Sequence, residues 1–283
     1  MGQMAFSIDV EEWFHGIELS QEAWADKPSR IEQGMDRLLR ILDDSGRYGT
    51  FFVLGAVAES HPHLVRSLSD AGHEVASHGY RHEKVYTQTP DVFRKEESRT
   101  KCLLEDLTGQ PVRGYRAPYF SITHDSAWAL SNLRDLGYEY DCSISPVMSW
   151  RYGIKGAPEG LFRFSDLDLY EYTVSSWKLL GRRFASGGAY FRIFPFAWTT
   201  KPFASSDPTM FYAHPWEYDP GHPRIRFDLR AMVTHYAKLS STEPKSRRLI
   251  ETYPFERVCD VIDGAVARSS IPEIDSATLR AHA

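Results

Sequence analysis

The stretch TFFVLGAVAESHPHLVRSLSDAGHEVASHGYRH, residues 50–82, decides the fold. It opens with a continuous apolar run over 50–54, which is typical of a strand buried on both faces of a parallel sheet. A helix is predicted over 62–71, because a proline starts this segment and a glycine follows it. A second strand over 73–77 ends directly before His78 and His82. A strand, a helix and a strand of these lengths predict a βαβ unit in a parallel sheet.

The same alternation continues on both sides of this unit. Upstream, a short apolar strand is expected over 5–10, and Ser29 with Glu32 has the form of a capping box that starts a helix. Downstream, the pattern predicts helices over 90–107, 125–136, 230–239 and 256–266, strands over 114–116, 138–143 and 210–214, and antiparallel strands within 161–195. We therefore expect an α/β fold in which residues 5–223 form a distorted (β/α) barrel, closed rather than open. Residues 224–283 are expected to form a C-terminal helical extension packed on the barrel.

The composition excludes several classes of protein. The chain has 283 residues, of which 42% are hydrophobic and 25% charged, and its net charge of −5 offers no basic surface for nucleic acid. No stretch is long and apolar enough for a transmembrane segment. Cys102, Cys142 and Cys259 form neither a zinc motif nor a disulfide framework, so we expect reduced, buried thiols. Because no signal peptide is visible, a cytoplasmic location is expected.

His78 and His82 are candidate metal ligands. Two imidazoles four residues apart can bind one metal ion if the segment makes a helical turn. The alternative, a pair of surface or core histidines, is the commoner fate of this spacing. A metal site therefore requires a third ligand from elsewhere in the chain.

Asp9 and Glu11 can supply that ligand. On a strand, residues two apart point to the same side, so both carboxylates can enter the same end of the barrel. One of them could bind the metal while the other stays free as a base. The alternative is a solvated acidic turn at the end of a strand.

Arg116 and His214 each follow a predicted strand as well. Arg116 precedes a proline turn and can hold a carboxylate in place, although a surface arginine would have the same pattern. His214 lies between an apolar strand and Pro215, where a hydrogen-bonded structural histidine is the usual alternative. The carboxyl ends of parallel barrel strands build the active site. The shared position of these side chains is thus stronger evidence than any single motif.

Read in order, these segments resemble the polysaccharide deacetylase family, also called the NodB-homology or carbohydrate esterase 4 group. The residues that carry the resemblance are Asp9 with Glu11, His78 with His82, Arg116 to Tyr119, Asp141 and His214. The resemblance covers roughly residues 5–220 and implies a barrel of the NodB-homology type. The stretches DVEEWFH (9–15), GGAYFR (187–192) and HPWE (214–217), with the tail from Arg224, are similar to a subgroup that accompanies bacterial exopolysaccharide and exosortase loci.

The resemblance implies a metal-dependent hydrolase that removes N-acetyl groups from a carbohydrate, either a polysaccharide or a glycan precursor. It places a divalent metal, Zn²⁺ ahead of Co²⁺ or Ni²⁺, on His78, His82 and Glu11, with Glu12 as the alternative carboxylate. A metal-bound water then attacks the acetamide, with Asp9 as base and His214 as acid. Arg116 holds Asp9, the main-chain N–H of Tyr119 stabilises the oxyanion, and Asp141 orients Arg116 or His214. The aromatic residues expected to stack on sugar rings are Trp13, Tyr80, Tyr190 and Trp216.

Two positions depart from the family pattern. Most members have two adjacent aspartates in the first motif, whereas Val10 occupies the second place here and the acid is Glu11. Cys142 stands where the subgroup tends to have a serine beside Asp141. Two alternatives therefore stay open, an amidohydrolase of a small cyclic amide or ureide, and a carbohydrate-binding protein without catalysis.

Overall fold

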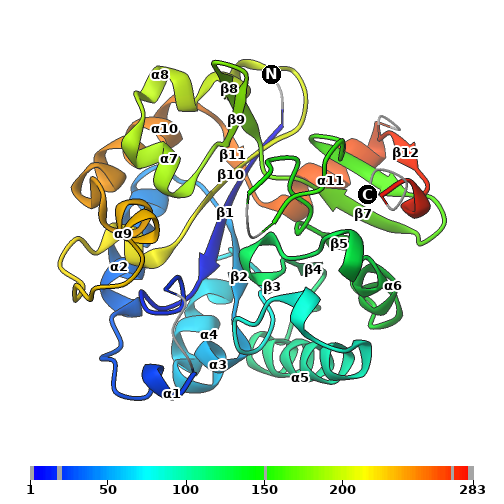
Figure 1. The fold of residues 1–283 in the computed structure, drawn as a ribbon, viewed down its shortest axis with the longest axis horizontal. Helices are drawn as coiled ribbons and strands as arrows, with labels where there is room; N and C mark the ends of the chain where they lie inside the picture. The colour runs from blue at the N-terminus through cyan, green and yellow to red at the C-terminus, as the bar shows by residue number, and fades with distance from the viewer. Residues whose placement is uncertain (1–2, 18–20, 150–151, 269–270, 280–283) are drawn as a thin grey trace.

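A computed structural model describes residues 3–17, 21–149, 152–268 and 271–279. At its centre lies a curled, mostly parallel sheet with helices around the outside (Figure 1). The strands of this sheet follow one another in the order β10 (Thr209–Ala213), β1 (Met4–Val10), β2 (Thr50–Val53), β3 (Glu74–Ser77), β4 (Gly114–Tyr115), β5 (Tyr140–Asp141), β7 (Leu169–Tyr172), β6 (Leu161–Phe164) and β12 (Glu273–Ile274). A further strand, β11 (Phe255–Glu256), pairs with β1. The predicted distorted (β/α) barrel is confirmed, in the form of a curled half-barrel.

The sheet does not close through a continuous ladder. Strands β10 and β12 lie at its two ends, and the link across the opening comes from the segment that follows β7. There, the Ser175 N–H donates to the Met210 carbonyl at 3.1 Å, and Gly187 forms an isolated parallel bridge with Tyr212. The hairpin of β8 (Ser176–Leu179) and β9 (Arg182–Ala185) forms a separate sheet. The closed barrel favoured by the repeated pattern is therefore an open curl with a few bridging contacts.

Helices cover the outer face because each buries an apolar stripe against the strands. In α2 (Ile31–Asp44), for example, the buried side chains include Met35, Leu38 and Leu42 at helical spacing. The other helices of the first half are α1 (Gln21–Trp24), α3 (Gly55–Ser60), α4 (Pro62–Asp70), α5 (Pro90–Thr108) and α6 (Trp128–Asp135). Those of the second half are α7 (Gly188–Ile193), α8 (Phe196–Thr199), α9 (Leu229–Tyr236), α10 (Thr242–Thr252) and α11 (Val258–Ala267).

One predicted helix cap is wrong, and the C-terminal region holds strands as well as its expected helices. Helix α2 has no side-chain cap from the predicted capping box, because the Ser29 hydroxyl donates to the Glu12 carboxylate instead. The residues after 223 are not purely helical, since β11 and β12 join the central sheet. The division into residues 5–223 and 224–283 stays a prediction.

The cysteines are unpaired, but only Cys142 and Cys259 are buried, whereas Cys102 is exposed on α5. Within the described ranges, no helix combines the length and apolar character that crossing a membrane requires.

Candidate active site

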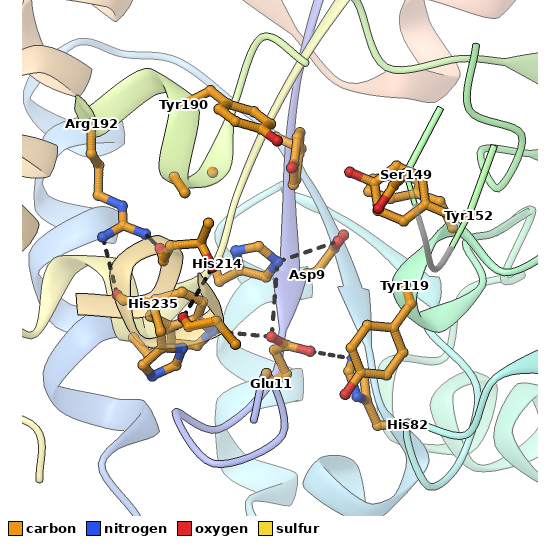
Figure 2. A pocket seen from close by; sticks show the side chains of 18 of the residues that line it. Asp9, Glu11, His82, Tyr119, Ser149, Tyr152, Tyr190, Arg192, His214 and His235 are labelled. Carbon is orange, nitrogen blue, oxygen red and sulfur yellow. Dashed lines mark hydrogen bonds and ion pairs between the residues drawn. The ribbon is translucent and has the colours of Figure 1, made fainter. Parts of the chain in front are cut away.

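The side chains selected from the sequence meet at the carboxyl ends of the parallel strands. Strands β10, β1, β2, β3 and β4 are neighbours and run in the same direction, so their carboxyl ends share one edge of the sheet. A pocket of about 350 Å³ opens there (Figure 2). Its floor carries Asp9, Glu11, His78, His82, Tyr119 and His214.

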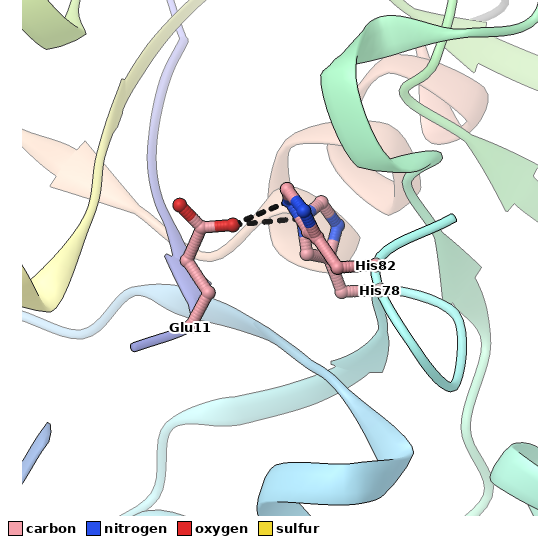
Figure 3. Close-up of side chains that lie close together, drawn as sticks. All are labelled: Glu11, His78 and His82. Carbon is pink, nitrogen blue, oxygen red and sulfur yellow. Dashed lines mark ion pairs between the residues drawn. The ribbon is translucent and has the colours of Figure 1, made fainter. Parts of the chain in front are cut away.

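Glu11, His78 and His82 form a compact triad (Figure 3). Each contributes one ligand atom, and these atoms lie within 4.8 Å of one another. The distance from Glu11 Oε2 to His82 Nε2 is 2.5 Å, and to His78 Nε2 it is 3.9 Å. All three side chains are buried.

The two histidines converge through a loop, not through the helical turn that the spacing suggested. Gly79 has φ +81° and His82 has φ +57°, and these left-handed residues fold the segment back on itself. The His78 Nδ1 bonds to the Arg116 carbonyl at 2.8 Å. Because a carbonyl can only accept, Nδ1 is the protonated nitrogen, and Nε2 presents its lone pair to Glu11.

The buried side chain of Glu97 supports this loop through Ser77. Ser77 donates its hydroxyl to Glu97 Oε2 at 3.1 Å and accepts the Gly79 N–H at 3.3 Å. Burial in the apolar interior raises the pKa of Glu97 to about 8. A neutral Glu97 therefore holds the loop in place without adding a second negative charge beneath the triad.

The triad fits a divalent cation. Glu11 Oε2 is buried and makes no assigned hydrogen bond within the described part of the chain, although two imidazole nitrogens face it. The other oxygen, Oε1, accepts the Trp216 indole N–H at 3.0 Å, which fixes the carboxylate. Two imidazoles and one carboxylate are a typical donor set for catalytic zinc, with ligand atoms roughly 3.3 Å apart around a tetrahedral ion. Glu12, the alternative ligand, lies elsewhere and accepts from Ser29 and the Arg30 N–H.

The charges in the triad match such a site. Burial raises the pKa of the Glu11 carboxyl, but the imidazoles of His82, His214 and His78 outweigh burial and hold the pKa well below its ordinary value. Burial also lowers the pKa of His78 to about 4. At neutral pH the site thus offers an anionic oxygen and a neutral imidazole nitrogen, which are the forms that bind a metal.

Asp9 is held apart from the triad by Arg116. The guanidinium Nη1 contacts Asp9 Oδ1 at 2.5 Å, while Nη2 donates to the Ser7 hydroxyl at 2.9 Å. Arg116 is fully buried, and its charged group lies 4.0 Å from the centre of the Phe52 ring. The side chain is therefore locked in one orientation, with Asp9 Oδ2 left toward the pocket, 3.9 Å from His214 Nε2.

His214 is positioned by a buried pair of opposite charges. Its Nδ1 bonds to Glu217 Oε1 at 2.7 Å, and its own main-chain N–H donates to the same oxygen at 3.1 Å. Glu217 Oε2 lies 2.6 Å from Arg192 Nε. Arg192 also donates to the carbonyls of Thr234, His235 and Ala237 at the end of α9.

These carboxylates decide the charge of His214. Burial lowers the pKa of the imidazole, but the negative charges of Glu11, Glu217 and Asp9 outweigh burial and raise the pKa to about 9. The ring is consequently cationic at neutral pH. Its Nε2 lies 3.8 Å from Glu11 Oε1, so a proton donor stands beside the triad.

Tyr119 borders the pocket in a strained conformation. Its φ is +57°, an unusual value for a tyrosine, within the short turn Pro118–Phe120. The ring packs against His82 with centroids 4.5 Å apart, and the hydroxyl donates to the His15 carbonyl at 2.9 Å.

Four predicted residues lie outside the pocket lining, and the first is Arg116, which is fully buried. Trp13 is buried and donates its indole N–H to the Pro28 carbonyl at 3.1 Å. Tyr80 donates to Glu59 at 2.7 Å, away from the pocket lining. Asp141 contacts neither Arg116 nor His214 directly. It accepts from the Ser143 hydroxyl, which in turn accepts the Ala117 N–H at 2.7 Å. Asp141 thus holds the loop that follows Arg116, whereas Tyr190 and Trp216 do line the pocket.

The structure adds residues that the sequence did not single out. These residues are Glu217, Arg192 and His235, and the first two lie in the quoted stretches HPWE and GGAYFR. An acid three residues after a histidine was an available signal for Glu217. His235 is brought to the pocket by α9, and nothing in its local sequence indicates this.

Comparisons with known proteins relate two parts of the chain to family models. Residues 24–140 match the family model described as "Polysaccharide deacetylase", and residues 142–263 match one described as "Domain of unknown function (DUF3473)". The first match contains His78, His82 and Arg116, whereas His214 lies in the second. Residues 24–140 are thus similar to the polysaccharide deacetylase family.

Two curated relatives match part of the chain. A peptidoglycan deacetylase-like protein of Gibberella zeae is 38% identical over 116 residues, 40% of this chain and 33% of that protein. A peptidoglycan deacetylase of Helicobacter pylori is 31% identical over 118 residues, 40% of this chain and 38% of that protein. The chain thus spans less than half the length of these relatives.

A crystal structure of a candidate polysaccharide deacetylase from Mycobacterium smegmatis has the same fold. The TM-score is 0.65 with 21% sequence identity, and the alignment covers 96% of this chain and 92% of the other. At this identity the likeness concerns the fold alone.

Proposed function

We propose that the chain, whose residues 24–140 match the polysaccharide deacetylase family, is a metal-dependent hydrolase that removes N-acetyl groups from a carbohydrate. The observation that carries this proposal is the meeting of Glu11, His78 and His82 with a held carboxylate and a cationic histidine in one pocket. A Lewis acid, a base and an acid are the three groups that metal-assisted hydrolysis of an amide uses.

Glu11, His78 and His82 are the proposed ligands of the cation, and zinc suits this donor set best. When bound, the cation would polarise the acetamide carbonyl and lower the pKa of water. The chain's own contribution is a fixed donor geometry. Glu11 is held by the Trp216 indole, and His78 by the Arg116 carbonyl.

Asp9 is the proposed base. Arg116 binds Oδ1 and leaves Oδ2 as the acceptor that faces the pocket, so the attacking water can deliver its proton there. A carboxylate with one oxygen bound by a buried guanidinium keeps its orientation during the reaction. Arg116 is thus a positioning residue for Asp9.

His214 is the proposed acid. Its pKa of about 9 keeps the ring protonated at neutral pH, and the proton on Nε2 can pass to the sugar nitrogen as the amide bond breaks. Glu217 stabilises the cationic ring and fixes Nδ1, which leaves Nε2 toward the pocket. The main-chain N–H of Tyr119 is the proposed donor to the developing oxyanion.

The substrate is an N-acetylated carbohydrate, a polysaccharide or a glycan precursor. Aromatic side chains line the pocket together with the polar groups of the site, among them Tyr119, Tyr152, Tyr190 and Trp216. Such rings stack on the apolar faces of sugars. The relatives named peptidoglycan deacetylases support this substrate class. The link to bacterial exopolysaccharide loci stays a prediction, and no observation favours the cyclic amide or the inactive binding protein.

The test is acetate release from N-acetylglucosamine oligomers, measured together with metal content. Activity lost on chelation and restored by zinc or cobalt is expected. His82→Ala removes one proposed ligand and should abolish both metal binding and turnover. His63→Ala is its control, because His63 is exposed and lies on the outer helix α4. Purified protein that holds metal but releases no acetate would assign the site to another amide. Protein that binds no metal and shows no turnover would refute the proposal.

A further inference from the structure

One wall of the pocket is made by helix α9 and by a glycine that faces it. Ala231, Thr234 and His235 line the pocket from α9, and Gly16 lines it from the loop after β1. None of these residues contributes to the proposed chemistry. They line the same pocket as Glu11 and Trp216, and Figure 2 shows His235 on the Arg192 side of that pocket.

His235 is a buried polar residue with unused hydrogen-bonding capacity. Its exposed fraction is 4%, and its Nε2 has no hydrogen-bond partner among the described residues. The ring stacks on Trp216 with centroids 4.1 Å apart and meets the edge of Tyr236 at 4.7 Å. A buried polar atom without a partner is unfavourable by roughly 1–3 kcal/mol, so an aromatic side chain such as phenylalanine would serve packing alone better.

Gly16 leaves a space between His235 and the proposed metal ligand. A Cβ at this position would lie 3.5 Å from Glu11 Oε1 and 3.6 Å from His235 Nδ1. Both values are ordinary van der Waals contacts, so an alanine fits without displacing either residue. The absence of a side chain therefore leaves space between the metal ligand and the Nδ1–Cε1 edge of the His235 ring, whereas the unpartnered Nε2 is buried.

The position of His235 is fixed relative to the reacting groups. Arg192 donates to the His235 carbonyl at 3.1 Å and to the Thr234 carbonyl at 2.6 Å. The same guanidinium is paired with Glu217, which orients His214. One buried arginine thus holds the main chain at His235 and the carboxylate that orients the proposed acid, while the imidazole of His235 is held by its stacking on Trp216.

We propose that Gly16 and His235 form a substrate subsite, in which the His235 imidazole makes a hydrogen bond to a hydroxyl group of the N-acetylated sugar and so contributes to its selection. This inference rests on the proposed function. Burial lowers the pKa of His235 to about 2, and a neutral imidazole has one donor and one acceptor nitrogen, which suits a hydroxyl. The subsite accepts an uncharged, hydroxyl-bearing ligand.

Three variants test the subsite with N-acetylglucosamine tetramer as the probe. His235→Phe keeps the stacked ring and removes both nitrogens, His235→Gln restores a donor and an acceptor, and Gly16→Ala fills the gap. Gly221→Ala is the matched control, since its Cβ would also make ordinary contacts, to Asp219 and Arg30, outside the pocket. Binding is measured by tryptophan fluorescence with Trp216 as reporter, and turnover by acetate release from the metal-loaded protein.

For His235→Phe and Gly16→Ala we expect the Kd and KM to rise roughly 3- to 10-fold with kcat within about twofold of wild type, as the loss of one uncharged hydrogen bond predicts. His235→Gln should recover part of the affinity, and Gly221→Ala should match wild type. Wild-type Kd and KM in His235→Phe would overturn the subsite and leave the proposed function intact. Binding that is weakened by His235→Phe in a protein without turnover would retain the subsite and refute the hydrolase. A wild-type protein that neither binds nor cleaves the tetramer would overturn both.

Discussion

Replacing Glu217 by glutamine removes one buried charge while it keeps the shape of the side chain. In the native protein, Glu217 Oε1 accepts from the ring and the main chain of His214, and Oε2 pairs with Arg192. A glutamine oxygen can still accept from His214. The variant therefore tests the charge of Glu217 and not its size.

The expected effect is a lower pKa of His214. A hydrogen bond between charged partners contributes about 1.5–3 kcal/mol and a neutral one about 0.5–1.5 kcal/mol. The middles of these two ranges differ by roughly 1.3 kcal/mol, which corresponds to about one pKa unit. Since the wild-type pKa is about 9, the cationic form of His214 falls roughly fivefold at pH 9 but hardly changes at pH 7.

The assay is the pH dependence of kcat/KM for acetate release. The alkaline limb of the profile should move down by about one unit in Glu217→Gln, whereas the exposed control Glu251→Gln should leave it in place. The test compares the position of the alkaline limb in the variant with that in the wild type. The absolute position is not used, because a cation bound at Glu11 would weaken the effect of Glu11 on the pKa of His214.

An unchanged alkaline limb in Glu217→Gln would refute the assignment of Glu217 as the residue that stabilises the cationic His214. The loss of a buried partner for Arg192 also destabilises the fold, by about 3–5 kcal/mol. Profiles are therefore measured at a temperature at which circular dichroism shows the variant to be folded.

Three further predictions concern the metal, the packing and the stability of the protein. His82→Ala should lose both the bound metal and the turnover, because only two ligands remain, and elemental analysis showing stoichiometric metal would contradict the ligand set. Gly34→Ala should lower the free energy of unfolding by about 1–3 kcal/mol, since its Cβ would lie 2.1 Å from the Pro215 carbonyl oxygen in the turn after His214. Urea denaturation that shows Gly34→Ala to be as stable as wild type would refute this close approach. Asp141→Asn should flatten the pH dependence of stability, because burial raises the pKa of Asp141, which shares a hydrogen bond with the buried Glu171. The folded state then holds more protons than the unfolded one, so stability is greatest below the ordinary pKa of an aspartate and falls as the pH rises toward the higher folded-state pKa. Equal slopes in Asp141→Asn and wild type between pH 4 and 7 would exclude this origin.

Local patterns predicted most of the regular elements. The helix expected over 62–71 is α4, Pro62–Asp70, and the strand expected over 5–10 is β1, Met4–Val10. These segments carry their own signals, namely a proline at the helix start and apolar runs that must be buried. The short helix α3 was not predicted, since it follows β2 without a capping residue.

Patterns of two or four residues were less reliable when a distant partner competed for the same side chain. Ser29 had the spacing of a helix cap, yet its hydroxyl binds Glu12 from the loop after β1. His78 and His82 had the spacing of a helical turn, yet Gly79 and the support of Glu97 from α5 fold the segment as a loop. The convergence of the two imidazoles was foreseen, but for a different local geometry.

The sequence by itself determined the parallel sheet and the side chains that its strand ends present, among them Asp9, Glu11, His78, Arg116 and His214. Hydrophobic periodicity and the succession of strands and helices along the chain are properties of nearby residues. Parallel strands then bring their carboxyl ends to one edge of the sheet. Only the tertiary structure decided which groups those side chains meet. Trp216 reaches Glu11 across 205 positions of the chain, and Arg192 joins Glu217 to the end of α9. Such partners are chosen by packing, because a buried charge or donor must find its complement wherever the fold brings one within reach.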